Sequence, residues 1–171
     1  MANISIYLTN LGKYNEGSLI GEWVSLPVDE DELNEVLKRI GINEEYEEYF
    51  ITDYDSDIPG LYIGEYDSLS ELNEIAEQIE DMDPDCVEAA MYFYSNRQEA
   101  LENVENIVYI GQTGRNTAEE IIGYYFAKEC GCLNIPEEIE NYFDFEAYGR
   151  NIMIKGSFYE NEKGEIYELI A

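Results

Sequence analysis

The sequence predicts an α+β protein that is an elongated chain of three small domains. Alternation of apolar and polar residues near both ends indicates strands, whereas the middle of the chain has helical periodicity. Hydrophobic residues make up 45% of the chain, which is enough to form a core. The formal net charge of -30 favours an expanded arrangement over a sphere, because like charges repel one another.

Residues 1–60 are predicted to form an N-terminal α+β domain. Apolar residues at every second position indicate the first strand, and Asp29 and Gly41 are a typical N-cap and stop for the helix. The glycines and asparagine of "LGKYNEG" indicate a loop. The predicted elements are a strand at 3–9, a loop at 11–17, strands at 19–26 and 47–54, and a helix at 29–40.

Residues 61–104 are predicted to form a central helical domain. Its clearest helix is 68–81, where Ser68 and Glu71 fit a capping box. The polar positions of this helix carry acids and no lysine, although like charges three or four residues apart each cost a few tenths of a kcal/mol. The apolar stripe is Leu69, Leu72, Ile75 or Ala76, and Ile79, and further helices are expected at 85–94 and from a Ser95 cap.

Residues 105–171 are predicted to form a C-terminal α+β domain. Thr117 is a typical N-cap, and "NEKG" is typical of a turn between two strands. The predicted elements are a strand at 106–111, a helix at 117–129, two short helical pieces within 135–149, and a hairpin of strands at 151–159 and 165–170.

The acidic residues are concentrated in one stretch of the sequence. The chain has 39 acids against 9 bases, and no Lys or Arg lies between Arg39 and Arg97. This surface should repel nucleic acids and membranes, which are anionic, so a partner recognised by charge must be basic. The predicted target-binding acids are Glu44, Glu45, Glu47, Glu48, Asp53, Asp55, Asp57, Glu65, Asp67, Glu71, Glu74, Glu77, Glu80, Asp81, Asp83, Asp85 and Glu88.

Motifs for catalysis or metal binding are incomplete in this sequence. The chain has no histidine and no GxxxxGK phosphate loop, so we expect neither an enzyme nor a cofactor. Ile58 and Gly64 occupy positions of a calcium loop that require Gly and Glu, and "CGC" lacks the further ligands of a metal site. The segment "VYIGQTGRN" is similar to half of the GIY-YIG nuclease signature, but the other half is absent.

Cysteine content and the apolar segments indicate a cytoplasmic protein. Three cysteines at no disulfide-scaffold spacing favour reduced thiols. The first ten residues do not have the pattern of a signal peptide, and no apolar run approaches the ~20 residues that span a bilayer.

The charge itself favours mimicry of another polyanion, although a solvated acidic surface is the simpler structural explanation. Duplex DNA carries one charge per ~1.7 Å of axis, so a net charge of -30 matches about 15 base pairs. Helical carboxylates three or four residues apart lie ~5–6 Å from each other, which is similar to the spacing of phosphates along a strand.

Three blocks of the sequence resemble the ArdA family of antirestriction proteins: "NLGKYNEGSLIGEWVSLP", "NEEYEEYFITDYD" and "IPEEIENYFDFEAYGRNI". The resemblance implies a DNA mimic that is encoded on mobile genetic elements and occupies the DNA-binding groove of type I restriction–modification enzymes. It also implies a curved homodimer. An alternative that the charge alone leaves open is an acidic interaction domain or chaperone for another basic DNA-binding protein.

The block "NYFDFEAYGR" resembles the antirestriction motif of that family, which lies in the domain associated with dimerisation. The resemblance implies a dimerisation role for its apolar residues, but aromatic enrichment is equally typical of a core. These residues are Tyr142, Phe143, Phe145, Ala147 and Tyr148.

Overall fold

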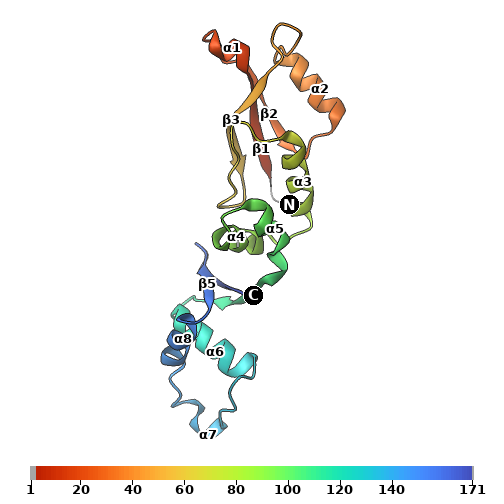
Figure 1. Cartoon of the computed structure of the whole chain (residues 1–171). Coiled ribbons are helices and arrows are strands. Elements are labelled where there is room, and N and C mark those ends of the chain that lie inside the picture. Colours follow the sequence, from red (N-terminus) through yellow and green to blue (C-terminus); the bar gives the residue numbers. More distant parts are fainter. Residues whose placement is uncertain (1–2, 171) are drawn as a thin grey trace. The chain divides into compact units, whose positions relative to one another are not determined.

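The structure, a computed structural model, describes residues 3–170 and separates into two compact units, Met1–Glu88 and Ala89–Ala171 (Figure 1). Each unit contains a three-stranded antiparallel sheet together with helices, which confirms the α+β class. The division into domains at 1–60, 61–104 and 105–171, the elongated arrangement and the curved dimer stay predictions.

The first unit is built on a sheet in the order β2-β1-β3, with β1 (Ile4–Asn10) between β2 (Gly21–Leu26) and β3 (Tyr49–Ser56). Ile6 and Leu8 are completely buried, as the period-two alternation predicts for the inner face of a half-buried strand. The registers place buried residues opposite one another, Ile4 against Leu26 and Ile6 against Val24. The three predicted strands are therefore confirmed, with small shifts in their ends.

Two long helices of the first unit, α2 (Glu30–Arg39) and α3 (Leu69–Glu80), lie along the same side of the sheet in Figure 1. The carboxylate of Asp29 accepts a hydrogen bond from the backbone N–H of Glu32 at 2.8 Å, which confirms the predicted cap. On α3 the whole predicted apolar stripe is buried. Asn73 ties α3 to the loop after β2, because its side chain exchanges two hydrogen bonds with the backbone of Val28.

Three local predictions in the first 100 residues are wrong. Ser68 lies at the N-cap position of α3, but its side chain accepts no hydrogen bond from the helix, which leaves the first amides to water. The predicted loop at 11–17 contains a short helix, α1 (Leu11–Asn15), because the side chain of Asn10 caps it. The helix expected from Ser95 is capped instead by Asn96, whose side chain accepts two backbone hydrogen bonds, and α5 spans Arg97–Glu102.

The second unit has a sheet in the order β4-β6-β5, with β4 at Ile107–Gln112, β5 at Ser157–Glu160 and β6 at Glu165–Leu169. The predicted hairpin is confirmed, but its first strand does not begin at 151. Residues 151–153 belong to α8 (Phe145–Met153), because Ile152 and Met153 pack from this helix on the core of Ile110, Ile122 and Ile166.

The other helices of the chain follow the predicted segments. Thr117 caps α6 (Ala118–Tyr124) through its hydroxyl, as predicted, and the helix continues as the π-helical turn η2 (Tyr125–Glu129). The boundary between the units falls within α4. The remaining elements are α4 (Pro84–Phe93), the 3-10 turn η1 (Val104–Asn106) and α7 (Glu137–Glu140).

Helices α6 and α8 approach each other unusually closely because a glycine lies on each side of the contact. A Cβ atom on Gly149 would overlap the backbone carbonyl of Glu119, and one on Gly123 would overlap the carbonyl of Phe145. Both glycines are buried, so their role is to let two backbones pack against each other.

Within residues 3–170, no helix has both the length and the apolar character to cross a membrane.

Candidate acidic interaction surface

The structure places most of the predicted target-binding acids at the surface. Asp67 and Asp85 are half-buried, and Glu88 is 7% exposed, so Glu88 does not contribute an open carboxylate. The exposed acids are Glu44, Glu45, Glu47, Glu48, Asp53, Asp55, Asp57, Glu65, Glu71, Glu74, Glu77, Glu80, Asp81 and Asp83. All of these lie in the first unit, on a loop, a strand, a helix and the connections between them.

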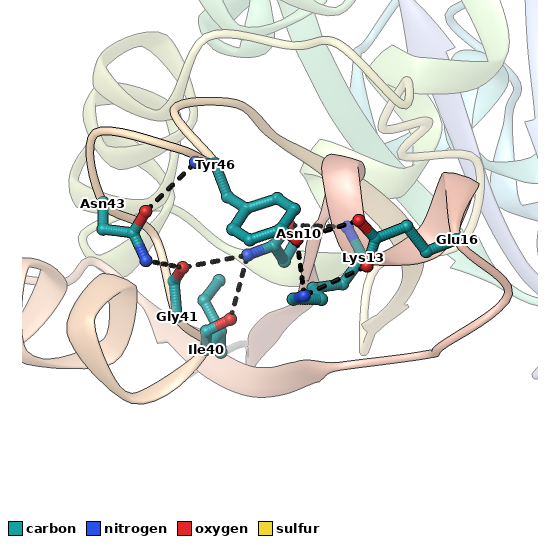
Figure 2. Close-up of polar contacts among 7 residues, drawn as sticks. All are labelled: Asn10, Lys13, Glu16, Ile40, Gly41, Asn43 and Tyr46. Carbon is teal, nitrogen blue, oxygen red and sulfur yellow. Dashed lines mark hydrogen bonds and ion pairs between the residues drawn. The ribbon is translucent and has the colours of Figure 1, made fainter.

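The first group of acids lies on the loop 43–48, which its own backbone and a few neutral side chains hold in place (Figure 2). Asn43 accepts hydrogen bonds from the backbone N–H groups of Glu45 and Tyr46, at 2.8 and 3.1 Å. The backbone carbonyl of Glu48 accepts a bond from Leu11 at 3.0 Å. The loop therefore presents its four glutamates from a fixed backbone, although they repel one another.

Tyr46 fastens this loop to the first helix (Figure 2). Lys13 donates to the phenol oxygen of Tyr46 at 2.6 Å and to Glu16 at 3.0 Å, and Tyr46 donates to Glu16 at 2.8 Å. The hydrogen bonds to Tyr46 and Glu16 raise the pKa of Lys13, and the hydrogen bond from Lys13 lowers the pKa of Glu16. Both groups thus stay charged near neutral pH, and Lys13 neutralises Glu16.

The other basic residues of the first unit also pair with acids outside the predicted set. Arg39 donates to Glu22 and to Glu32, each at 2.8 Å, and these bonds raise its pKa. Lys38 pairs with Glu35 at 2.6 Å, which lowers the pKa of that carboxyl. These partners lie on β2 and α2. Lys38 and Arg39 therefore form these ion pairs with acids outside the predicted target-binding set.

The second group of acids lies on helix α3. Glu71, Glu74, Glu77 and Glu80 are exposed, while the apolar stripe of the same helix is buried. A single helix therefore carries a core face and a row of carboxylates at spacings of three residues. We call these four glutamates the α3 row.

The third group lies on and after β3. The registers place Asp53 opposite Tyr7 and Asp55 opposite Ser5, on the face of the sheet opposite the core residues Ile4, Ile6 and Leu8 of β1. Asp57 accepts the backbone N–H of Asn3 at 3.0 Å. The aromatic residues beside these acids were not among the sequence-predicted site residues. Tyr7 and Trp23 lie at positions that alternate with the buried apolar residues of β1 and β2, where polar side chains are usual.

The predicted dimerisation residues do not share one environment. Tyr142 is 87% exposed, whereas Phe143 contacts both Phe145 and Tyr148, with ring centroids 4.9 and 5.8 Å apart. Phe145 also contacts Tyr124 of α6, at 5.4 Å. Ala147 is half-buried, and its backbone N–H donates a hydrogen bond to the carboxylate of Asp144, the N-cap residue of α8. The motif thus combines packed aromatic residues with one open tyrosine.

The segments that resemble other kinds of site have ordinary structural positions. Asp53 and Asp55 of the incomplete calcium loop lie on a strand, and the residues after "VYIG" form a turn before α6. Cys130 and Cys132 are exposed and flank Gly131, which has a positive φ of 65°. Among residues 3–170, no three His, Cys, Asp or Glu side chains are grouped so that they could hold a metal ion.

Comparison with known proteins identifies the family of this chain. The family model described as antirestriction protein (ArdA) matches residues 6–167, whereas a comparison with curated proteins found no match. The matched region includes most of both sheets, every helix of the described chain and all the predicted acids. Because a match of this extent covers nearly the whole sequence, the chain belongs to the ArdA family of antirestriction proteins.

Proposed function

We propose that this protein inhibits type I restriction–modification enzymes by occupying the basic groove in which they bind DNA. One observation carries the proposal: the first unit displays exposed carboxylates along a stretch of sequence that contains no Lys or Arg. The family assignment supports an antirestriction role, and the charge supports a basic partner. The inhibitor would act in the cytoplasm and needs neither a cofactor nor a catalytic group.

The local geometry supports mimicry of a phosphate backbone. Residues three apart on a helix have Cβ atoms ~5–6 Å from one another, so the glutamates of the α3 row approximate the spacing of a run of phosphates. The loop 43–48 adds four more carboxylates on a backbone held by Asn43 and Tyr46. A fixed display of charge lowers the ordering cost of binding, which favours a competitor over a flexible polyanion.

The proposed mechanism is competitive and non-catalytic. The carboxylates would contact the lysines and arginines that normally contact DNA phosphates, and the inhibitor itself would not bind nucleic acid. Association would be steered by the long-range field and accompanied by release of anions from the enzyme, so binding should weaken as salt rises. Each exposed pair contributes little by itself, so the affinity depends on many of them.

We expect the protein to displace duplex DNA from a type I methyltransferase at near-stoichiometric amounts. The assay would titrate the full chain into a complex of the methyltransferase with labelled duplex and follow the release of DNA by fluorescence anisotropy. Repeating the titration at about 50 and 200 mM salt should show weaker displacement at the higher salt, because counterion effects on phosphate-type contacts are large in that range.

Polyglutamate of equal total charge is the control for this assay. It should displace far less DNA, since it has the charge without the fixed arrangement. Equal displacement by polyglutamate would contradict shape-specific mimicry. Failure to displace DNA at large excess would contradict the proposal for that enzyme, and would favour an acidic chaperone for another basic DNA-binding protein.

We also propose that the protein acts as a homodimer that buries Tyr142 together with the neighbouring part of the C-terminal motif. Tyr142 is 87% exposed and Ile139, on the preceding helix α7, is 52% exposed. Tyr142→Ala should shift sedimentation from dimer to monomer, because aromatic anchors at the centre of an interface often contribute ~2 kcal/mol or more. Tyr66→Ala, which removes a tyrosine that is 73% exposed in the first unit, is the control and should leave the dimer unchanged.

A further inference from the structure

We propose that the outer face of the first sheet binds an arginine side chain of the protein's partner. This inference deepens the proposed function, on which it rests, by identifying one place where a specific basic residue of the restriction enzyme is recognised. The face is made by alternate residues of the three strands, and we call it the aromatic–acidic face. Its residues are Ser5, Tyr7, Trp23, Ser25, Asp53 and Asp55.

The strand registers bring these six residues together in two rows across the sheet. Tyr7 of the central strand lies opposite Trp23 on one side and Asp53 on the other. Ser5, two residues earlier, lies in the same way between Ser25 and Asp55. Directly opposed residues on one face of a sheet have Cβ atoms ~4.5–5.5 Å apart, so each row runs from β2 to β3 without a gap.

The aromatic part of this face is exposed but well ordered by its contacts. Trp23 is 49% exposed, and its ring meets that of Tyr7 edge to face, with centroids 5.4 Å apart. The hydroxyl of Tyr7 donates to the backbone carbonyl of Gly21 at 3.0 Å, which fixes the tyrosine ring against β2. The indole of Trp23 is therefore open to solvent, beside a tyrosine ring whose position is fixed by its hydrogen bond to β2.

A shallow cavity lies between the indole and the two aspartates. It has a volume of about 410 Å³ and is lined by Ser5, Trp23, Asp53, Tyr54 and Asp55. Its lining thus combines the indole of Trp23 with the carboxylates of Asp53 and Asp55. A side chain that enters this cavity can contact a π face and an anion at the same time.

Arginine is the side chain whose chemistry matches this combination. Its guanidinium is planar, stacks on aromatic rings and donates in a fork that fits carboxylates, whereas a lysine ammonium is a strongly hydrated point charge. Charge complementarity excludes phosphate-bearing ligands, because Asp53 and Asp55 would repel them. The face lies within a stretch of net negative charge, so the surrounding acids would also favour a cation.

Trp23 is the only tryptophan of the chain, so its fluorescence reports on this face directly. The first experiment titrates the full chain with a capped tetra-arginine peptide and, separately, with tetra-lysine of equal charge. We expect a saturable change in emission with tetra-arginine and at least about threefold weaker binding of tetra-lysine, since stacking favours the guanidinium. Absence of a saturable change with tetra-arginine would overturn the inference.

Two double variants separate local contacts from the general field of the protein. Asp53→Asn with Asp55→Asn should weaken tetra-arginine binding by about fivefold or more, because charge-assisted hydrogen bonds are lost. Glu30→Gln with Asp31→Asn removes the same charge from α2, outside the predicted target-binding acids, and should change binding by less than about twofold, because neither residue lies on the aromatic–acidic face and exposed charges at a distance are screened. Equal weakening by both variants would overturn the inference.

Variants of Trp23 distinguish this inference from the proposed function. In the DNA-displacement assay, Trp23→Leu should weaken inhibition and Trp23→Phe should retain most of it, while circular dichroism shows that both variants fold. If Trp23→Leu inhibits like the original chain, the inference fails and the proposed function stands. If tetra-arginine binds at Trp23 as expected but the original chain does not displace DNA, the proposed function fails and the arginine site stands.

Discussion

Gly149→Ala is expected to destabilise the second unit severely. In an exposed helix the same change stabilises by roughly 0.5–1 kcal/mol, because alanine is the better helix former. Here the added methyl would overlap the backbone carbonyl of Glu119, and a backbone atom cannot rotate away as a side chain can. Overpacking costs ~1–3 kcal/mol and sometimes more, which corresponds to a fall in melting temperature of about 4–8 °C per kcal/mol in a domain of this size.

Thermal unfolding followed by circular dichroism would measure this effect. Asn151→Ala is the control, because Asn151 is exposed on the same helix and its side-chain amide donates one hydrogen bond to the carbonyl of Ala147, within the helix. That variant should unfold within a few degrees of the original chain. A Gly149→Ala protein as stable as the control would contradict the close backbone contact between α6 and α8.

Replacing the four glutamates of the α3 row by glutamine is expected to weaken inhibition strongly. If each carboxylate forms an exposed pair of 0.2–1 kcal/mol with the target, four of them contribute roughly 0.8–4 kcal/mol. The affinity should then fall by between about fourfold and several hundredfold. Glu77→Gln alone should change the affinity by less than about fivefold. The quadruple variant should fold at least as well as the original, because like charges on one helix destabilise it.

The matched control removes the same number of charges from other parts of the surface. Glu105, Glu129, Glu138 and Glu162 are exposed in the second unit, and replacing these by glutamine gives the same net charge as the α3 variant. DNA displacement by both variants at one salt concentration separates a local effect from a general one. Equal weakening would show that the α3 row is no more important than any other four acids.

Much of the fold could be predicted because its signals are local. The cap at Asp29, the cap at Thr117 and the apolar stripe of α3 each depend on residues within a few positions of one another, and all are confirmed. The loop prediction at 11–17 failed because glycine was interpreted as a turn former. Gly12 instead makes room for the ring of Tyr46, which is more than thirty positions away, and such a contact leaves no local pattern.

The candidate surface could be predicted less completely than the fold. Charge is visible in composition, so the exposed acids of 43–48 and the α3 row were expected. Burial of Glu88 could not be predicted, because every other residue from Cys86 to Phe93 is apolar and the helix therefore has no polar face that would define its phase. The aromatic–acidic face was missed because it depends on register: Tyr7, Trp23 and Asp53 become neighbours only when three strands are aligned.

Besides the contact of Tyr46 with Lys13 and Glu16, the loop 43–48 and the residues before it are held by hydrogen bonds between neutral groups, whose strength depends less on salt than the proposed affinity does. Hydrogen bonds from backbone amides to Asn43, and from Asn10 to the carbonyls of Ile40 and Gly41, carry no net charge and are not screened by ions (Figure 2). Attraction between carboxylates and a basic groove is screened. Rising salt should therefore weaken the proposed binding to the enzyme before it weakens these neutral contacts, so that the loop keeps its backbone conformation when the protein is released.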